Sequence, residues 1–405
     1  MIPEFRKDFN ARFQPAMYRR LLDRMDRESR THVDFRISET PCFFPAELLS
    51  EMAKAGEELT HQLVDSPDYM RRSDAAVPDR YRIPADDRHP NFMTADFGLA
   101  HDTEGHLLPR LVELQAFPSI YGYQALLSLA MHQEYSLDPN LRWFLSGLDE
   151  PDYWALLRQV IVAQHDPENV ILMEIEPERQ KTLPDFHATK DRLGIEIVDI
   201  THIVKQGNRL CYPRKSSRGT VLTPVRRIYN RAIVDELERK RIELAFDYRD
   251  DLDVEWAGNP NWYFRISKFS LPWLNHPMVP RAVFLSDWYA GHRADLPEDR
   301  SQLVLKPLYS FAGTGIVFAP SQHELDMIPV ADREKYLLQE RVSFAPVIET
   351  PFGPTQAEVR VLYIWPDEGK LTPVLILTRM GRGKMMGVDH NRDQQWVGST
   401  AAYLI

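Results

Sequence analysis

The sequence predicts a mixed α/β fold with more than one domain. A chain of 405 residues exceeds one average domain, which has roughly 150 residues. Hydrophobic residues make up 43% and charged residues 27%, values that are ordinary for a globular protein with a sizeable core. From Asn169, the apolar run VILMEI, a helical stretch and the apolar run IEIVDI alternate as strand, helix and strand, which is typical of a parallel sheet.

Composition excludes several classes of protein. The net charge of −10 is spread along the chain and argues against a general nucleic-acid surface. Cys42 and Cys211 are the only cysteines, too few for a disulfide framework or a four-cysteine zinc site, so a reducing cytoplasm is expected. The first residues contain no apolar signal region, and no run of about 18 apolar residues occurs. We therefore expect no export signal and no membrane span.

The N-terminal region, residues 1–90, is expected to be helical. Apolar residues recur every three or four positions over 14–30 and 45–66, and Pro45 stands at the start of the second run. Both stretches are therefore predicted to be helices. Residues 67–89 are crowded with Pro, Asp and Arg, which favours a surface loop or linker over core.

A hairpin and two helices are predicted next. The segment FMTADFGLAHDTEGHLLPRLVELQAF has two apolar runs around the turn sequence Asp-Thr-Glu-Gly, which indicates two short antiparallel strands. Helical periodicity follows Ser119, and a further helix is predicted over 152–164. After the strand, helix and strand from Asn169, residues 227–244 supply one more strand and helix, and AGNPNW marks a break.

An apolar strand and a small-residue loop form a candidate phosphate site. In LVLKPLYSFAGTGI the strand ends at Lys306, and the loop that follows contains Ala312, Gly313, Thr314 and Gly315. Glycines let backbone N–H groups approach an anion, and a lysine at the strand end offers a mobile positive charge. An ordinary β-turn beside a solvated lysine is the alternative for this fragment alone.

Three later strands carry further polar groups. YLLQERV leads into Gln339, Glu340 and Arg341, where a strand end can offer polar groups to an adenine and a ribose, or can simply be a surface strand end. AEVRVLYIW places Glu358 and Arg360 on one face, which suits a metal and a phosphate or, alternatively, a common cross-strand ion pair. The last of these, ILTRMGRGKMMGVDHN, gathers charged and polar side chains that could also form a solvated loop, namely Arg379, Arg382, Lys384 and Asn391.

The order of these motifs resembles the ATP-grasp superfamily. That superfamily has a metal-binding Glu-x-Asn motif after the late basic strand, and no such motif follows here. In circularly permuted members, the eukaryotic-type glutathione synthetases and glutathionylspermidine synthases, the motif lies upstream, and Glu113, Gln115 and Ser119 match it. The resemblance implies a circularly permuted ATP-grasp fold with an inserted α/β substrate-binding domain and a helical N-terminal region.

The same resemblance implies ATP and Mg²⁺ as cofactors and assigns roles to residues. Gln115 replaces the family's asparagine, and Ser310 stands where glutathione synthetases have a metal-binding glutamate, for which Glu358 is expected to compensate. The implied metal ligands are Asp96, Glu113, Gln115 and Glu358. The implied nucleotide-binding residues are Lys268, Lys306, Ala312, Gly313, Thr314, Gly315, Gln339, Glu340, Val342 and Lys384. Arg379 is implied to stabilise an acyl-phosphate and Arg231 to hold a substrate carboxylate, whereas ion-paired surface roles are the alternative for Arg231 and Lys268.

The resemblance also divides the chain and implies a function. The division is an N-terminal helical region (1–90), a metal-binding part of the core (91–165), an α/β substrate-binding domain (166–258) and a nucleotide-binding domain (259–405). The implied function is an ATP- and Mg²⁺-dependent carboxylate–amine ligase that acts through an acyl-phosphate on small-molecule acid and amine substrates. Neither nucleic acid nor membrane is an expected partner, and similarity to glutathione synthetase-like enzymes suggests a homodimer. The alternatives are a phosphotransferase and a catalytically decayed nucleotide-binding regulatory protein.

Overall fold

A computed structural model describes residues 2–84, 87–102, 104–217, 219–293, 295–309, 313–384, 386–387, 391 and 393–405. Within these ranges the chain forms four β-sheets covered by helices. The predicted mixed α/β class is confirmed.

The largest sheet has six strands in the order β1-β17-β16-β15-β2-β3. All neighbours are antiparallel except β1 and β17, which are parallel. The predicted hairpin is confirmed as β2 and β3, whereas β1 and its pairing were not predicted. The bounds are β1 (Cys42–Phe44), β2 (Phe92–His101), β3 (Leu107–Gln115), β15 (Gln356–Ile364), β16 (Thr372–Gly381) and β17 (Gly398–Leu404).

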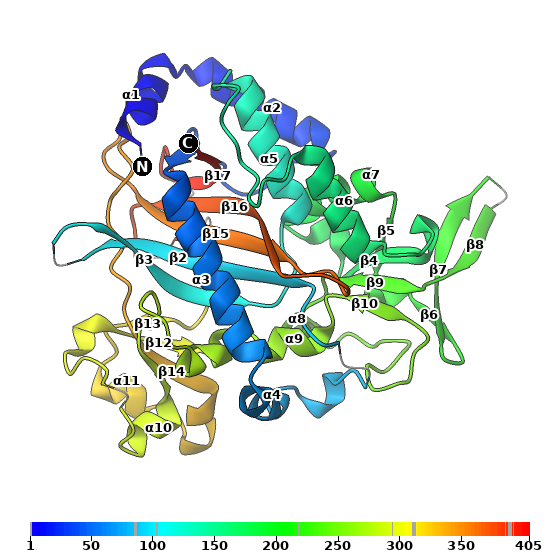
Figure 1. The fold of residues 1–405 in the computed structure, drawn as a ribbon. Helices are drawn as coiled ribbons and strands as arrows, with labels where there is room; N and C mark the ends of the chain where they lie inside the picture. Colours follow the sequence, from blue (N-terminus) through cyan, green and yellow to red (C-terminus); the bar gives the residue numbers. More distant parts are fainter. Residues whose placement is uncertain are drawn as a thin grey trace.

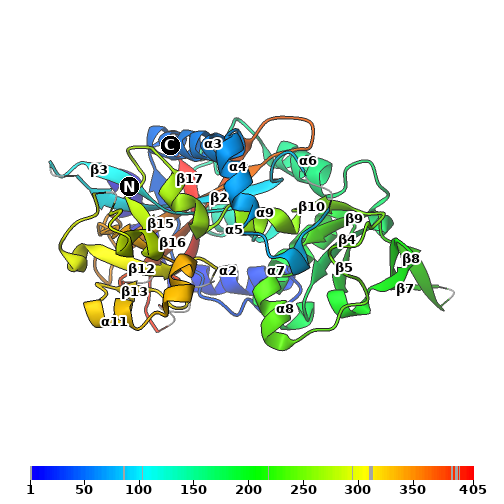
Figure 2. The ribbon, with the colours of Figure 1, turned by 90° about the horizontal axis from the view of Figure 1, so that it is seen from below.

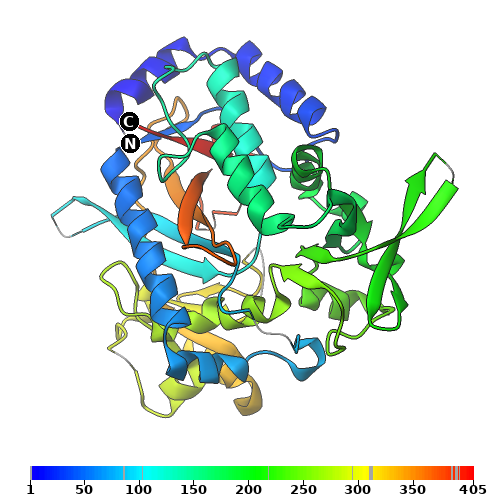
Figure 3. The same ribbon diagram turned by 45° about the vertical axis from the view of Figure 1, so that its right-hand side comes forward.

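Helices cover both faces of this central sheet. Helix α3 runs across one face, where it packs on Ala95, Phe97 and Leu99 (Figure 1). Helix α5 covers part of the other face and carries α2 on its outer side (Figure 3). These three helices and α6 confirm the predicted helices. The bounds are α1 (Pro3–Arg12), α2 (Pro15–Glu28), α3 (Ala46–Val64), α5 (Tyr121–Glu134) and α6 (Glu150–Ile161).

The loop predicted over residues 67–89 is wrong in its first half. Residues 67–74 form helix α4 (Pro67–Asp74), and Tyr69, Val77 and Tyr81 are buried. The Ser66 side chain accepts a hydrogen bond from the Tyr69 N–H, and Pro67 occupies the first turn. A capping serine followed by proline and an acidic residue is a helix-start signal, which outweighs the local abundance of turn residues.

A parallel sheet with the order β10-β9-β4-β5 confirms the predicted strand, helix and strand alternation. A three-stranded antiparallel sheet projects from it and was not predicted (Figure 1). The bounds are β4 (Val170–Glu174), α7 (Leu183–Leu193), β5 (Glu196–Asp199), β6 (Val204–Gln206), β7 (Arg209–Ser216), β8 (Gly219–Pro224), β9 (Arg227–Asn230), α8 (Val234–Lys240) and β10 (Glu255–Ala257).

The fourth sheet is antiparallel, with the order β11-β14-β12-β13. In Figure 2 it lies in the same half of the molecule as β15 and β16 of the central sheet, and the parallel sheet lies in the other half. The predicted strands that end at Lys306 and Gln339 are confirmed as β12 and β14. The bounds are α9 (Pro260–Arg265), β11 (Ala282–Phe284), α10 (Leu285–Tyr289), β12 (Leu303–Pro307), β13 (Val317–Phe318), α11 (Gln322–Asp326) and β14 (Tyr336–Glu340).

The helices and the cysteines bear on two further expectations. No helix in the described part of the chain combines the length and the apolar character that crossing a membrane requires. Cys42 and Cys211 are both buried free thiols, and burial raises the pKa of Cys42 to about 12. Neither cysteine is therefore exposed for reaction at neutral pH.

Candidate functional site

A cavity of about 510 Å³ lies where the central sheet, the parallel sheet and the four-stranded antiparallel sheet that contains β12 and β14 meet. It brings together residues that the sequence places up to about 290 positions apart. The predicted site residues that line it are Asp96, Glu113, Gln115, Arg231, Lys268, Lys306, Gly313, Gln339, Glu340, Val342, Glu358, Arg379 and Lys384. Thr314 and Gly315 directly follow Gly313 but do not line the cavity. Ala312 and Ser310 lie outside the described residues.

Asp96, Glu358 and Arg360 come from one face of the central sheet. Ala357, Val359 and Val361 on β15 pack toward α3, so the alternate residues Glu358 and Arg360 face the other way. Asp96 alternates in the same manner with Ala95 and Phe97 on β2. Period-two alternation therefore explains why apolar strands can carry a buried cluster of charges.

A β-bulge in the hairpin aims two further groups at the cavity. Asp96 pairs with Glu113, but Phe97 pairs with Leu111, so Val112 is the extra residue on β3. Its carbonyl oxygen accepts a hydrogen bond of 3.2 Å from the Lys306 ammonium. The Glu113 carboxylate lies 3.1 Å from the Lys268 ammonium. Bulges re-aim side chains in this way and often lie beside functional sites.

Asp96 is held by two arginines. Arg360 donates two hydrogen bonds of 2.6 Å to its two carboxylate oxygens, and Arg379 donates a third of 2.6 Å. Burial favours the neutral acid, but the two guanidinium charges outweigh burial and lower the pKa of Asp96. Arg379 also contacts Glu358, whose pKa is raised by burial in spite of Arg379. The cluster is thus a hydrogen-bonded network with Arg379 at its cavity side.

Lys306 is buried without full compensation of its charge. Burial lowers its pKa to about 8, although Glu113 nearby favours the charged form, and Lys268 further disfavours it. An anion in the cavity would stabilise the ammonium of Lys306. The arrangement of Lys306, Lys268 and Arg379 around one space can therefore bind a phosphate or carboxylate.

Gln339 and Glu340 both line the cavity but differ in their hydrogen-bond partners. Neither the amide nitrogen nor the amide oxygen of the buried Gln339 has a hydrogen-bond partner among the described residues. Such a side chain costs free energy until a ligand supplies a donor and an acceptor. Glu340 lines the cavity, but its carboxylate accepts a hydrogen bond of 3.0 Å from Arg110. The amide of Gln339 is therefore available to a ligand, whereas the carboxylate of Glu340 is already paired with Arg110.

The far end of the cavity lies at the carboxyl ends of parallel strands. Glu174 ends β4 and Arg231 follows β9, which is its neighbour. Burial raises the pKa of Glu174 to about 8, although Arg231 opposes the shift. The Nε and Nη1 atoms of Arg231 have no hydrogen-bond partner among the described residues, and its guanidinium lies 5.2 Å from the centroid of Phe117. This end can hold a carboxylate beside a group that takes up protons.

Sequence reasoning missed three polar residues at this end: Glu174, Gln180 and Glu236. The Gln180 amide donates to the carbonyl oxygen of Ile175 at 2.8 Å and lies within hydrogen-bonding distance of Glu236. Ligands of open α/β sheets bind at the carboxyl ends of strands, so the residue that ends the VILMEI run was identifiable from that rule.

Four further polar residues named from the sequence differ in where they lie. Ser119 and Arg360 line the cavity. Arg382 donates to the backbone of Gln395 at 2.8 Å and to Thr350 at 3.0 Å, and Asn391 donates to the backbone of Gly387 at 3.2 Å. These last two residues therefore brace the loop after β16.

A preformed metal cage is not present among the described residues, which contain no group of three or more His, Cys, Asp or Glu side chains suited to one. Both oxygens of Asp96 already accept arginine hydrogen bonds. Glu113 and Gln115 also line the cavity and are less buried than Asp96, and Glu113 pairs with a lysine. The donor set thus suits a cation that keeps most of its ligands from water and a bound anion.

Comparisons with known proteins give a likeness in structure alone. No protein-family model matches the sequence, and no curated protein matches it. Among solved structures, the chain is similar to a glutathione synthetase-like effector from Globodera pallida in its apo form. The TM-score is 0.59 at 13% sequence identity, and the match covers 98% of this chain and 99% of the other. At that identity the likeness shows a shared mixed α/β fold over the whole length.

Proposed function

We propose that the chain is an ATP- and Mg²⁺-dependent carboxylate–amine ligase with a circularly permuted ATP-grasp fold. The observation that carries the proposal is the convergence of Lys268, Lys306 and Arg379 with Glu113 in one cavity. The whole-length likeness to a glutathione synthetase-like structure supports it. Lys306 is buried with its pKa lowered to about 8, and an anion beside it would stabilise its ammonium group.

The nucleotide would lie between the central and antiparallel sheets. Lys268 and Lys306 would bind its phosphates, with Lys384 at the rim. The φ angles of Gly313 and Gly315 are 75° and 76°, in the left-handed region. A Cβ atom at Gly315 would lie 2.8 Å from the Cγ atom of Pro307. Glycine is therefore required in this turn, whose N–H groups can approach a phosphate. Gln339 would pair with the purine edge, which offers both a donor and an acceptor.

The metal site in this proposal differs from the one implied by family resemblance. Glu113, with Gln115 and Glu358, would hold Mg²⁺, which completes its six ligands with water and phosphate oxygens. Mg²⁺ would offset the charge on the phosphates. Asp96 is instead proposed to position Arg379, because its oxygens are occupied by guanidinium groups. Lys268 would leave Glu113 for a phosphate when the nucleotide binds.

The chemistry would proceed in two steps. A substrate carboxylate oxygen attacks the terminal phosphorus, and the bond to ADP breaks. The amine nitrogen then attacks the acyl carbon, phosphate leaves with the bonding electrons, and the nitrogen loses a proton. Arg379 would stabilise the negative charge on the acyl-phosphate oxygens. Arg231 would hold a second carboxylate of the substrate, and Glu174 would accept the proton from the substrate's ammonium group.

Non-catalytic nucleotide binding is a second candidate. Glu113 is ion-paired with Lys268, and Gln115 carries an amide one methylene longer than the asparagine of the resembling family. A chain of this kind would bind ATP and release no phosphate with any acid and amine. A phosphotransferase would form ADP and a stable phosphoester. Small-molecule acids and amines are the partners we propose, in a cytoplasmic setting and with a homodimer as the expected assembly.

Thermal unfolding tests the nucleotide site. Wild type, Glu113→Ala and the exposed-residue control Glu298→Ala are heated with ATP, with Mg²⁺ and with both. A ligand that binds only the folded state stabilises it by about 2.7 kcal/mol at one hundred times its dissociation constant. We expect a shift with ATP plus Mg²⁺ in wild type and Glu298→Ala and a smaller one in Glu113→Ala. No shift in wild type at millimolar ATP contradicts the proposal, and phosphate release across acid and amine pairs separates ligase from non-catalytic binder.

A further inference from the structure

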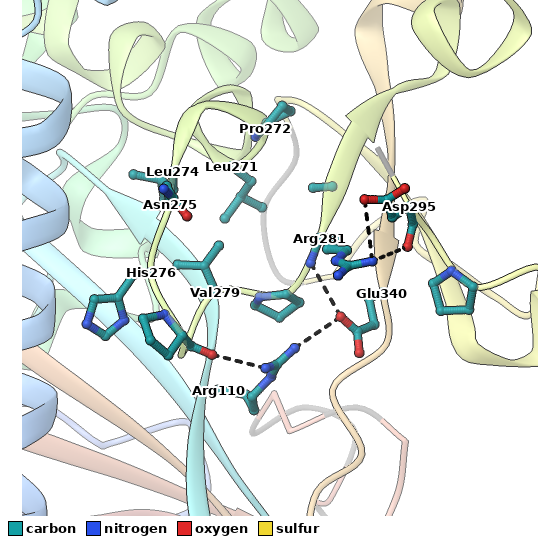
Figure 4. A pocket seen from close by; sticks show the side chains of 14 residues that line it. Arg110, Leu271, Pro272, Leu274, Asn275, His276, Val279, Arg281, Asp295 and Glu340 are labelled. Carbon is teal, nitrogen blue, oxygen red and sulfur yellow. Dashed lines mark hydrogen bonds and ion pairs between the residues drawn. The ribbon is translucent and has the colours of Figure 1, made fainter. Parts of the chain in front are cut away.

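A second cleft, of about 560 Å³, lies outside the central cavity (Figure 4). Its floor is the segment from Leu271 to Ala282, and its sides are Arg110 of β3, Glu340 of β14 and the turn at Asp295. Glu340 is the one residue that lines both spaces among the described residues. The cleft lies within the size range of small-molecule sites.

The walls of this cleft are fixed by backbone hydrogen bonds. The Leu111 N–H donates to the carbonyl oxygen of Met278 at 2.7 Å, and the Glu340 N–H donates to that of Arg281 at 2.8 Å. The Gln62 side chain of α3 holds both the N–H and the carbonyl group of Asn275, at 3.0 and 2.9 Å. A segment bonded to two strands and a helix presents its pocket ready-formed, which lowers the entropy cost of binding.

Two arginines converge on the cleft. Arg110 donates to the carbonyl oxygen of Pro277 at 3.1 Å and to the Glu340 carboxylate at 3.0 Å. Arg281 donates to the backbone oxygen of Asp295 at 2.6 Å, and its side chain remains 57% exposed. Figure 4 shows the Arg110 guanidinium directed toward Glu340 and the Arg281 guanidinium directed toward Asp295. Their planar donors match carboxylate and phosphate oxygens, and the exposed pair of Arg281 with Asp295 is weak.

We propose that this cleft binds a small organic anion through Arg110 and Arg281. The aliphatic side chains of Leu271, Leu274 and Val279 would contact its carbon body. The anion would replace Glu340 as the partner of Arg110, because one guanidinium edge cannot serve both. Two carboxylates beside the same arginine would also repel each other.

The release of Glu340 couples the two spaces. Glu340 adjoins Gln339, whose amide is open in the central cavity, so a carboxylate that turns from Arg110 can accept from a ribose hydroxyl. This step rests on the proposed nucleotide site. An anion in the cleft then raises nucleotide affinity, and the nucleotide raises anion affinity by the same factor, as thermodynamic linkage requires.

Anion binding is tested first, without nucleotide. Calorimetric titrations with succinate and with inorganic phosphate, at ionic strength matched with chloride, use wild type, Arg281→Gln, Lys306→Met and the surface control Arg293→Gln. Arg281→Gln keeps the backbone contact with Glu340 and removes only the guanidinium. We expect about tenfold weaker binding in Arg281→Gln, as for loss of one charge-assisted contact. Arg293→Gln should bind as wild type does, and Lys306→Met should keep the binding that Arg281→Gln weakens, because Lys306 lies in the central cavity and not in this cleft.

The preferred probe, succinate or phosphate, identifies the oxyanion that the cleft takes. If succinate and inorganic phosphate give no more heat than chloride, the cleft does not bind these anions and the proposal is wrong. If binding persists in Arg281→Gln and is lost in Lys306→Met, the anion binds in the central cavity, and the proposal is again wrong. ATP affinity is then measured with the probe present and absent. If the probe does not change the affinity for ATP, the two sites are not coupled. If wild type binds the probe but not ATP, the proposed function is contradicted, whereas the proposed anion site is not.

Discussion

Asp96 and Arg360 face each other across neighbouring strands of the central sheet and share two hydrogen bonds of 2.6 Å. Both side chains are buried, and the same carboxylate also holds Arg379. A bidentate contact of this kind fixes orientation as well as charge. Asp96 therefore determines where the guanidinium of Arg379 lies in the cavity.

We predict that Asp96→Asn lowers the free energy of unfolding by about 3 kcal/mol, because removal of one partner leaves a buried charge without its counterion. Urea denaturation measures the loss. Asp68→Asn is the control, since Asp68 pairs with Arg72 on the surface and should cost less than about 1 kcal/mol. Equal losses in the two variants would show that the buried network contributes no more than an exposed ion pair.

Lys306 should make stability depend on pH in the alkaline range. Its pKa in the folded state is about 8, below its ordinary value of 10.5, so the unfolded chain binds more protons between these two values. Stability therefore rises with pH across that window. Lys306→Met should lack this rise while otherwise unfolding as wild type does. Chemical denaturation at several pH values measures both, and parallel profiles for the two proteins would contradict the prediction.

A phosphate-bearing ligand should also make the protein take up protons near pH 8. An anion beside Lys306 favours the ammonium and raises its pKa. Calorimetric titration with ATP and Mg²⁺ in buffers of different ionisation enthalpy detects the uptake. Lys306→Met should remove it, and a binding heat that is independent of the buffer in wild type would count against contact with Lys306.

Glu174 should have the opposite pH dependence. Its pKa is raised to about 8 from an ordinary 4.5, so the folded state binds the extra proton between these values. Its contribution is full below about 4.5 and is lost as pH rises through about 8. Glu174→Gln imitates the protonated acid and should become progressively more stable than wild type as pH rises through this range. Glu178→Gln, at an exposed position, should follow the wild-type profile.

The side chain of Gln339 should contribute to ligand binding but lower the free energy of unfolding of the ligand-free protein. Its buried amide has no partner among the described residues, and such a group costs about 1–3 kcal/mol. Gln339→Met should therefore equal or exceed wild type in unfolding free energy and bind ATP more weakly. Gln124→Met is the matched control, because Gln124 donates to the backbone of Ile376 at 3.1 Å and its loss should destabilise the fold. A large loss of stability in Gln339→Met would mean that the amide is structural.

Local sequence patterns predicted most of the strands and helices and many of the residues that line the cavity. Period-two runs located the strands that bear Asp96, Glu358 and Lys306, and motif order brought the lysines and Arg379 to one proposed site. The bulge at Val112 was beyond such patterns, because it depends on the partner strand. The partners of Asp96 were equally hidden, since Arg360 and Arg379 lie far from it in sequence and meet it only in the folded sheet.

Other features depend on tertiary context. Glu340 looked like an adenine or ribose ligand, but Arg110 of another sheet engages it in this structure. The strand Cys42–Phe44 is too short to carry an alternating pattern and exists through its pairing with β17. Composition also misled over residues 67–74, where one capping serine decided the outcome.

Strand β17 lies between β1 and β16, so Cys42 pairs with Ala402, near the other end of the numbered chain. During synthesis, β1 and β16 cannot be joined until Gly398–Leu404 has emerged, and the backbone edges of both strands stay open until then. Slow closure by distant residues exposes unpaired edges to other chains. Substitutions in this strand should thus act on yield and aggregation during expression more strongly than on the chemistry of the finished molecule.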